Sequence, residues 1–115
     1  MINSVIQPLR TVRSYMSLPP DAKDAYKHDR AGVPTDDPGI EVAVKECLGW
    51  LGRAQDNSKY KDGGVARHYS LRTGWSASYP ETTGYIVPTV LEAASVRNNE
   101  DYRTRAARML DWLME

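Results

Sequence analysis

Aromatic and basic side chains are concentrated in residues 59–79, the stretch that joins two predicted helices. Aromatic rings offer apolar faces on which sugar rings can stack, and basic side chains bind carboxylates or phosphates. We therefore predict a substrate-binding surface here and in the turn that follows. Its members would be His68, Tyr69, Arg72, Trp75, Tyr79 and Tyr85. The alternative is that each ring only fills the core of a helical hairpin.

Glu81 is the acidic residue that we single out as a candidate for catalysis. It follows Pro80, so it would lie in the first turn of a helix, where the helix dipole favours an ionised carboxylate. Such a carboxylate suits ligand binding or general-base chemistry better than general-acid chemistry, which needs a raised pKa. Alternatively, Glu81 only completes a capping box with Ser78. Glycoside hydrolysis requires two carboxylates, and the sequence leaves open whether the protein is an enzyme.

The sequence contains no pattern for a metal or cofactor. It has two histidines and one cysteine, and no His-x-x-x-His spacing. A phosphate-cradling glycine loop and a nucleophile elbow are also missing. We therefore predict neither a metal nor a cofactor.

Overall composition argues against several classes of partner. Fifteen basic and fifteen acidic residues cancel, so the chain as a whole carries no electrostatic signature for nucleic acid or an anionic membrane. Cys47 is the only cysteine, which excludes an internal disulfide, and we expect a buried structural thiol. No apolar run approaches the roughly 20 residues of a membrane span, and no signal peptide is recognisable, so we expect a cytoplasmic protein.

The N-terminal third is predicted to contain a short helix and a proline-rich arm. Residues 2–16 have apolar side chains on one helical face, but Pro8 should interrupt or kink that helix. Residues 17–38 contain four prolines and should form a linker or extended arm, with a turn or two of helix at residues 22–30. We therefore divide the chain into an N-terminal arm, 1–37, and a helical region, 38–115.

Three helices are predicted in the second region, at residues 40–55, 80–97 and 101–115. Asp36 or Asp37 would cap the first helix. The second would be capped by Ser78 or Tyr79. It is apolar on nearly all sides, so it should be buried, with tight packing around Gly84 opposite Pro88. A single core should contain Leu48, Leu51, Ile86, Val90, Leu91, Leu110 and Leu113.

A shift of 62 residues superimposes the first helix on the third, with Trp50 matching Trp112 and Leu51 matching Leu113. Any two amphipathic helices can be aligned in part, but tryptophan is rare. The predicted order of elements matches the repeat of an α/α toroid or solenoid, which consists of an outer helix, a long loop, an inner helix, a short turn and another outer helix. The predicted fold class is therefore all-α, with antiparallel helical hairpins of an incomplete α/α toroid.

The same region resembles the first hairpin of bacterial α/α-toroid proteins. The resemblance rests on Trp-Leu-Gly-Arg-Ala-Gln-Asp at residues 50–56, Asp-Gly-Gly-Val at 62–65, Gly-Trp at 74–75 and Ser-Tyr-Pro-Glu-Thr-Thr-Gly-Tyr-Ile-Val-Pro-Thr at 78–89. These proteins are similar to six-hairpin glycosidases and to prenyltransferase and squalene-cyclase toroids, and many are encoded with polysaccharide-biosynthesis enzymes. The resemblance implies binding or processing of carbohydrate, particularly of uronic-acid glycans. A terpenoid-cyclase-like activity would need an aspartate-rich motif, which is missing.

About one and a half hairpins are present, so the chain resembles a fragment of a toroid or a short member of that class. The predicted central helix exposes apolar faces that two neighbouring helices cannot fully cover. Since large apolar patches rarely remain exposed in monomers, we expect a homodimer, with or without exchange of the N-terminal arms. The alternative function is therefore a non-catalytic helical module for structure or self-association.

Overall fold

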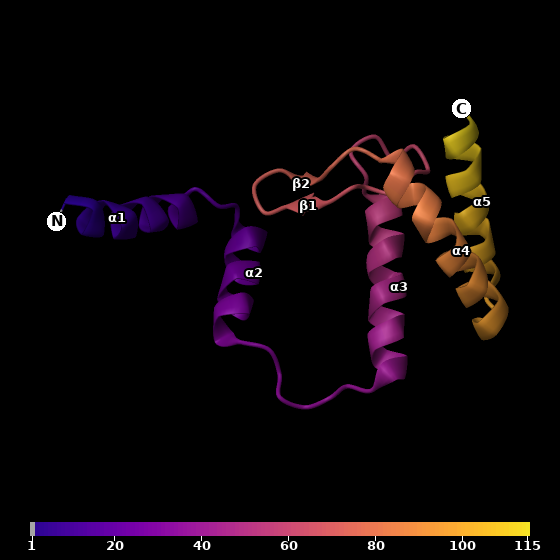
Figure 1. Cartoon of the computed structure of the whole chain (residues 1–115), viewed down its shortest axis with the longest axis horizontal. Coiled ribbons are helices and arrows are strands. Elements are labelled where there is room, and N and C mark those ends of the chain that lie inside the picture. The colour runs from indigo at the N-terminus through magenta and orange to yellow at the C-terminus, as the bar shows by residue number, and fades with distance from the viewer. Residues whose placement is uncertain (1) are drawn as a thin grey trace. The chain divides into compact units, whose positions relative to one another are not determined.

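The computed structural model describes residues 2–115, with side chains from residue 8 onward, as two compact units. The units comprise residues 1–37 and 38–115, and each is described by itself. The described chain contains five helices and one pair of two-residue strands (Figure 1). The predicted all-α class is thus confirmed.

The N-terminal unit is more helical than we predicted. Helix α1 (Ile2–Met16) continues through Pro8, so the predicted interruption is wrong. Helix α2 (Pro20–Ala31) has twelve residues rather than a turn or two. Pro20 suits its first turn because the fixed φ of proline is already helical and its missing N–H has no intrahelical partner to lose. Gly32, with φ of 86°, ends the helix.

Helices α1 and α2 meet through aromatic side chains. The Tyr15 and Tyr26 rings have centroids 5.2 Å apart and are tilted by 51°. Lys23 lies on the same contact, with Nζ 5.9 Å from the centre of the Tyr15 ring. Within α2, Ala22 is the buried residue.

The second unit begins with helix α3 (Ile40–Asp56). Its N-cap is Gly39, with φ of 81° and no side-chain cap bond, so neither Asp36 nor Asp37 caps the helix as predicted. Without a side-chain cap, the start of α3 depends on its backbone bonds, among them that from the Ala43 N–H to the Gly39 carbonyl.

Helices α4 (Pro80–Arg97) and α5 (Glu100–Met114) form an antiparallel hairpin (Figure 1). Asn98 closes α4 in the left-handed conformation, which asparagine tolerates better than most residues. Asn99 then caps α5, because its side chain accepts a hydrogen bond from the Asp101 N–H at 2.9 Å. Two consecutive asparagines therefore provide both the end of one helix and the start of the next.

The core lies where α3, α4, α5 and the loop at Val65 meet. Its buried members are Ala54, Val65, Val87, Val90, Ala106 and Met109. Five of the seven predicted core residues belong to it or pack against it: Leu51, Ile86, Val90, Leu91 and Leu113. Leu48 is buried but lies outside this cluster, and Leu110 is 43% exposed, so both assignments were wrong.

Helix α4 is covered on one side only. Tyr85 and Val96 are each 77% exposed, which contradicts the predicted burial on all sides. The predicted tight packing around Gly84 is also wrong, because a Cβ atom there would meet no neighbouring atom within 4 Å. The apolar composition of α4 therefore predicted more burial of this helix than the rest of the chain provides.

Helices α3 and α5 bury different faces, which argues against the 62-residue repeat. Cys47 is exposed, contrary to prediction, while its counterpart Met109 is 1% exposed. Leu48 is 6% exposed and its counterpart Leu110 is 43% exposed. Similar sequence patterns thus face different surroundings in the two helices.

Candidate functional site

A short β-hairpin displays the middle of the long loop. Strands β1 (Tyr69–Ser70) and β2 (Gly74–Trp75) pair in antiparallel fashion, with Tyr69 opposite Trp75. In the turn between them, the Ser70 hydroxyl accepts hydrogen bonds from the Arg72 and Thr73 N–H groups. Gly74 follows with φ of 76°, which an L side chain rarely adopts. These strands differ from the long irregular loop that the sequence predicts.

Three aromatic rings meet where this hairpin packs on α3, and we name Trp50, Tyr69 and Trp75 the aromatic cluster. The Trp50 and Trp75 centroids are 4.8 Å apart, and those of Tyr69 and Trp75 are 5.0 Å apart at 73°, an edge-to-face contact. Trp50 and Tyr69 are 6.5 Å apart. Such separations are typical of favourable aromatic contacts.

The aromatic cluster is partly buried and partly exposed. Trp75 is half-buried and packs against the core of the unit. Trp50 is 47% exposed and Tyr69 is 41% exposed, so both rings retain contact with solvent. The Arg53 guanidinium lies 5.9 Å from the centre of the Trp50 ring. The cluster therefore offers fixed aromatic surface next to a positive charge.

Thr83 connects the loop to α4. It is fully buried, its hydroxyl accepts from the Val65 N–H at 2.9 Å, and it donates to the Tyr79 carbonyl at 2.8 Å. The Tyr79 N–H in turn donates to the Val65 carbonyl at 3.0 Å. These bonds hold both ends of the hairpin-bearing segment against the start of α4.

Gln55 ties the same loop to α5. Its side chain is fully buried, and Nε2 donates to the carbonyls of Gly63 at 2.8 Å and Arg105 at 3.0 Å. Its Oε1 accepts from the Arg105 guanidinium at 3.2 Å. A buried amide with these bonds fixes three segments at one point.

An ion-pair cluster lies beside Gln55. Arg105 contacts both carboxylate oxygens of Asp56, at 2.9 and 2.8 Å, and one oxygen of Asp101 at 3.0 Å. The hydrogen bond from Arg105 lowers the pKa of Asp56 despite partial burial. The same bond to Asp56 raises the pKa of Arg105. The guanidinium and the two carboxylates are paired with one another, which indicates that Arg105, Asp56 and Asp101 have a structural role.

Ser78 interacts with Asp62 instead of forming the predicted capping box. Burial tends to raise the pKa of its carboxyl, but hydrogen bonds from Ser78, the Gly64 N–H and Trp112 together lower it. Ser78 donates to Asp62 at 2.5 Å. Tyr79 is the N-cap of α4, with no side-chain cap bond, so the predicted Ser78–Glu81 box does not form.

Of the predicted binding residues, Tyr69 and Trp75 are joined through a ring contact. Tyr79 contacts a different partner, the Arg67 guanidinium, 4.8 Å from its ring centre. Tyr85 is exposed on α4, and Glu81 is exposed in the first turn of that helix.

His68 and Arg72 are both exposed on the hairpin segment. The His68 N–H donates to the Ser76 hydroxyl, and Arg72 occupies the turn between the strands. Trp50 was not predicted as a binding residue, because it widens the apolar face of its helix. The available signal was its place at the edge of that stripe, three residues before Arg53.

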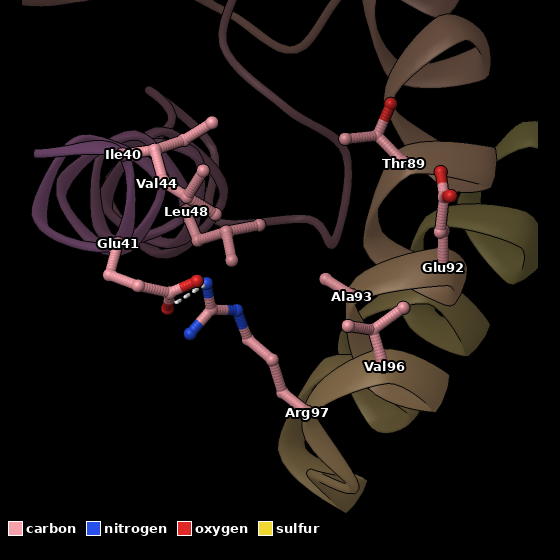
Figure 2. Close-up of a pocket in the computed structure, with 9 residues that line it drawn as sticks. All are labelled: Ile40, Glu41, Val44, Leu48, Thr89, Glu92, Ala93, Val96 and Arg97. Atoms are coloured by element: carbon pink, nitrogen blue, oxygen red, sulfur yellow. Dashed lines mark hydrogen bonds and ion pairs between the residues drawn. The ribbon is translucent and has the colours of Figure 1, made fainter.

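A second feature is an open groove between α3 and α4, with a volume of about 330 Å³. Figure 2 shows apolar side chains on both walls and the Glu41–Arg97 ion pair, at 3.1 Å, bridging between them. The residues that line the groove are Ile40, Glu41, Val44, Leu48, Thr89, Glu92, Ala93, Val96 and Arg97. We name it the α3–α4 groove.

Comparison with protein families, curated proteins and solved structures finds no match to this chain. Within the part of the chain that the structure describes, no group of three or more His, Cys, Asp or Glu side chains could hold a metal ion. Every helix in residues 2–115 is too short or too polar to traverse a bilayer.

Proposed function

We propose that residues 38–115 bind carbohydrate at the aromatic cluster. The observation that carries this proposal is the contact of Trp50, Tyr69 and Trp75, three rings from separate elements with two of them substantially exposed. Rings held in place before binding lose little conformational freedom when a ligand stacks on them. The resemblance to α/α-toroid proteins of polysaccharide biosynthesis supports the same class of ligand.

Uronic-acid glycans are the favoured ligands within this class. Arg53 lies against the Trp50 ring, and Arg72 occupies the hairpin turn next to Tyr69. A guanidinium can bind a carboxylate with two parallel hydrogen bonds, which a neutral sugar cannot offer. Glu81 stays a candidate general base for processing the bound glycan, and a catalytic role would require a second acidic group.

Calorimetric titration tests the binding proposal. The protein is titrated with oligogalacturonate and, separately, with a neutral oligosaccharide of the same length. We expect saturable binding of the acidic oligosaccharide and at least tenfold weaker affinity for the neutral one. Trp50→Ala and Tyr69→Ala should each weaken binding about fivefold or more, since stacking on an aromatic ring contributes on the order of 1 kcal/mol.

Tyr60→Ala is the matched control for these variants. Tyr60 belongs to the same long loop and is 65% exposed, but it contacts Lys59 rather than the aromatic cluster. Its substitution should leave the affinity unchanged. The proposal would be refuted if neither oligosaccharide gave binding heat at millimolar concentration. Equal losses of affinity in all three variants would also refute it.

A second candidate function is self-association through the α3–α4 groove. Its support is the apolar lining, together with the exposure of Ile40 and Val96 at 78% and 77%. A second copy would bury these side chains, and removal of apolar surface from water favours association. In this case, the unit would be a homodimeric helical module without catalysis.

Light scattering after size-exclusion chromatography tests that candidate. We expect a concentration-dependent mass that approaches twice 12.9 kDa. Val96→Ser should shift the equilibrium toward single chains. Met114→Ser is the control, because Met114 is 86% exposed and does not line the groove. A single-chain mass at high micromolar concentration would exclude the homodimer.

A further inference from the structure

Helix α1 carries an apolar stripe that α2 does not cover. Leu9, Val12 and Met16 are spaced by three and four residues, so they share one face of the helix. They are 65%, 55% and 69% exposed. Three large apolar side chains aligned in this way form a continuous surface, whereas scattered exposed residues need no explanation.

Basic residues flank this stripe on both sides. At 100° per residue, Arg13 lies at one edge of the face that Leu9, Val12 and Met16 define, and Arg10 lies further round the helix on the same side. Tyr15 lies along the other edge, with the Lys23 ammonium 5.9 Å from its ring centre. Long basic side chains can keep their charge in water while their stems cover apolar surface.

Acidic residues are absent from the sequence of this helix. Residues 1–20 include Arg10 and Arg13 but no Asp or Glu. The acidic residues of the N-terminal unit begin in α2 and continue in the linker, at Asp21, Asp24, Asp29, Asp36 and Asp37. Asp24 is paired with Lys27 at 3.4 Å. Neutrality of the whole chain therefore conceals a locally cationic, amphipathic helix.

We infer that α1 binds the surface of an anionic lipid bilayer, lying in the plane of the interface. A helix of modest overall hydrophobicity, with an apolar face bordered by basic residues, is typical of this mode of binding. The negative surface complements Arg10, Arg13 and Lys23 together, and the acyl boundary accepts the apolar stripe. Tyr15 at the edge suits the headgroup level, where amphipathic rings concentrate.

Vesicle flotation with the full chain tests this inference. Probe vesicles contain phosphatidylcholine with about one-quarter phosphatidylglycerol, and control vesicles contain phosphatidylcholine alone. We expect the protein to float with the anionic vesicles and its partition coefficient on neutral vesicles to be at least tenfold lower. High salt should release the protein, because attraction between basic residues and anionic lipid decays over the Debye length.

Two pairs of variants separate the apolar and electrostatic contributions. Leu9→Ser with Val12→Ser should lower the partition coefficient at least tenfold, whereas Val33→Ser, at a residue 90% exposed outside α1, should not. Arg10→Gln with Arg13→Gln should cause a similar loss, whereas Lys27→Gln with Arg30→Gln in α2 should cause little. The arginine pair keeps the test valid if the serine pair unfolds the helix.

Several results would overturn the inference. These are absence of binding to anionic vesicles, equal binding to both kinds of vesicle, or wild-type binding by the arginine pair. A serine pair that leaves vesicle binding intact but changes the molecular mass in light scattering would assign the stripe to a protein partner instead. Oligosaccharide binding at the aromatic cluster is measured independently and would be unaffected by any of these outcomes.

Discussion

At the scale of single residues, Gly64 lies in close contact with Trp112 and Ser78. A Cβ atom on Gly64 would lie 2.6 Å from Trp112 Cδ2 and 2.7 Å from Ser78 Cβ. The glycine is therefore required by close packing. Glu81, whose spacing from Ser78 matched a capping box, makes no such bond, since Tyr79 is the N-cap of α4 and the Ser78 hydroxyl donates to Asp62.

Gly64→Ala should destabilise the protein by about 1–3 kcal/mol, since the added methyl group overpacks a site that cannot expand freely. Gly84→Ala is the matched control within a helix. It adds the same methyl group where nothing lies within 4 Å, and it should stabilise the protein by about 0.5–1 kcal/mol because alanine favours the helix. Urea denaturation measures both, and equal effects of the two substitutions would contradict the packing described.

Asp56 should make stability depend on acid pH. Its pKa in the folded protein is below the ordinary value of 3.8, so its ion pair with Arg105 stabilises the fold fully above that value. The stabilisation is lost as the pH falls through the folded pKa. The difference in urea midpoint between wild type and Asp56→Asn should therefore be present at neutral pH and shrink below pH 3.8. A difference that stays constant with pH would exclude this linkage.

At the scale of elements, the spacing of apolar residues and the residues that begin and end helices predicted the helices of the second unit well. Pro80 and Arg97 bound α4 as expected, and the paired asparagines mark the turn into α5. Burial was predicted less well, because a stripe shows which face is apolar but not which neighbour covers it. Cys47 and Leu110 lie on such stripes and are exposed.

The candidate site was only partly predictable for a related reason. Tyr69 and Trp75 were recognised as aromatic residues of a long loop, but their pairing depends on a two-residue hairpin too short to give a strand pattern. Trp50 joins them from 19 residues before Tyr69 in the sequence, through a contact that only the folded loop creates.

Helix α5 should respond very differently to the same substitution at two methionines. Met109→Ala removes a side chain that is 1% exposed in the core, and it should cost about 2–5 kcal/mol. Met114→Ala removes one that is 86% exposed, and its effect should be within about 0.5 kcal/mol. Thermal or urea unfolding of both variants checks this, and a small loss at Met109 would show that α5 packs by another face.

At the scale of the whole molecule, the chain consists of two compact units joined near residue 38. The cores support this division, because Ala22 is the buried residue of α2 whereas the second unit has six buried residues in one cluster. Each unit therefore has its own packing, and the two proposed binding surfaces belong to different units.

Residues 38–115 should fold cooperatively when expressed alone. The core cluster and the hydrogen bonds of Gln55 and Thr83 lie within the unit, so removal of residues 1–37 leaves them in place. Circular dichroism should show a helical fragment with one sigmoidal thermal transition. A fragment of residues 58–115 is the control, and it should fail to fold because it lacks Ala54, Gln55 and the rest of α3. A shorter fragment as stable as the longer one would show that α3 is dispensable.

The bonds that Thr83 makes to Val65 and Tyr79 also have a kinetic consequence. An amide proton exchanges with deuterium only when its hydrogen bond opens, and loop amides ordinarily exchange fastest. Here the N–H groups of Val65, Ala66 and Tyr79 are bonded to Thr83, Ala54 and Val65 at 2.9, 3.0 and 3.0 Å. Because these partners are buried, Ala54 and Val65 in the core cluster and Thr83 in α4, the three loop amides should exchange as slowly as those of α4 and open only when the unit itself unfolds.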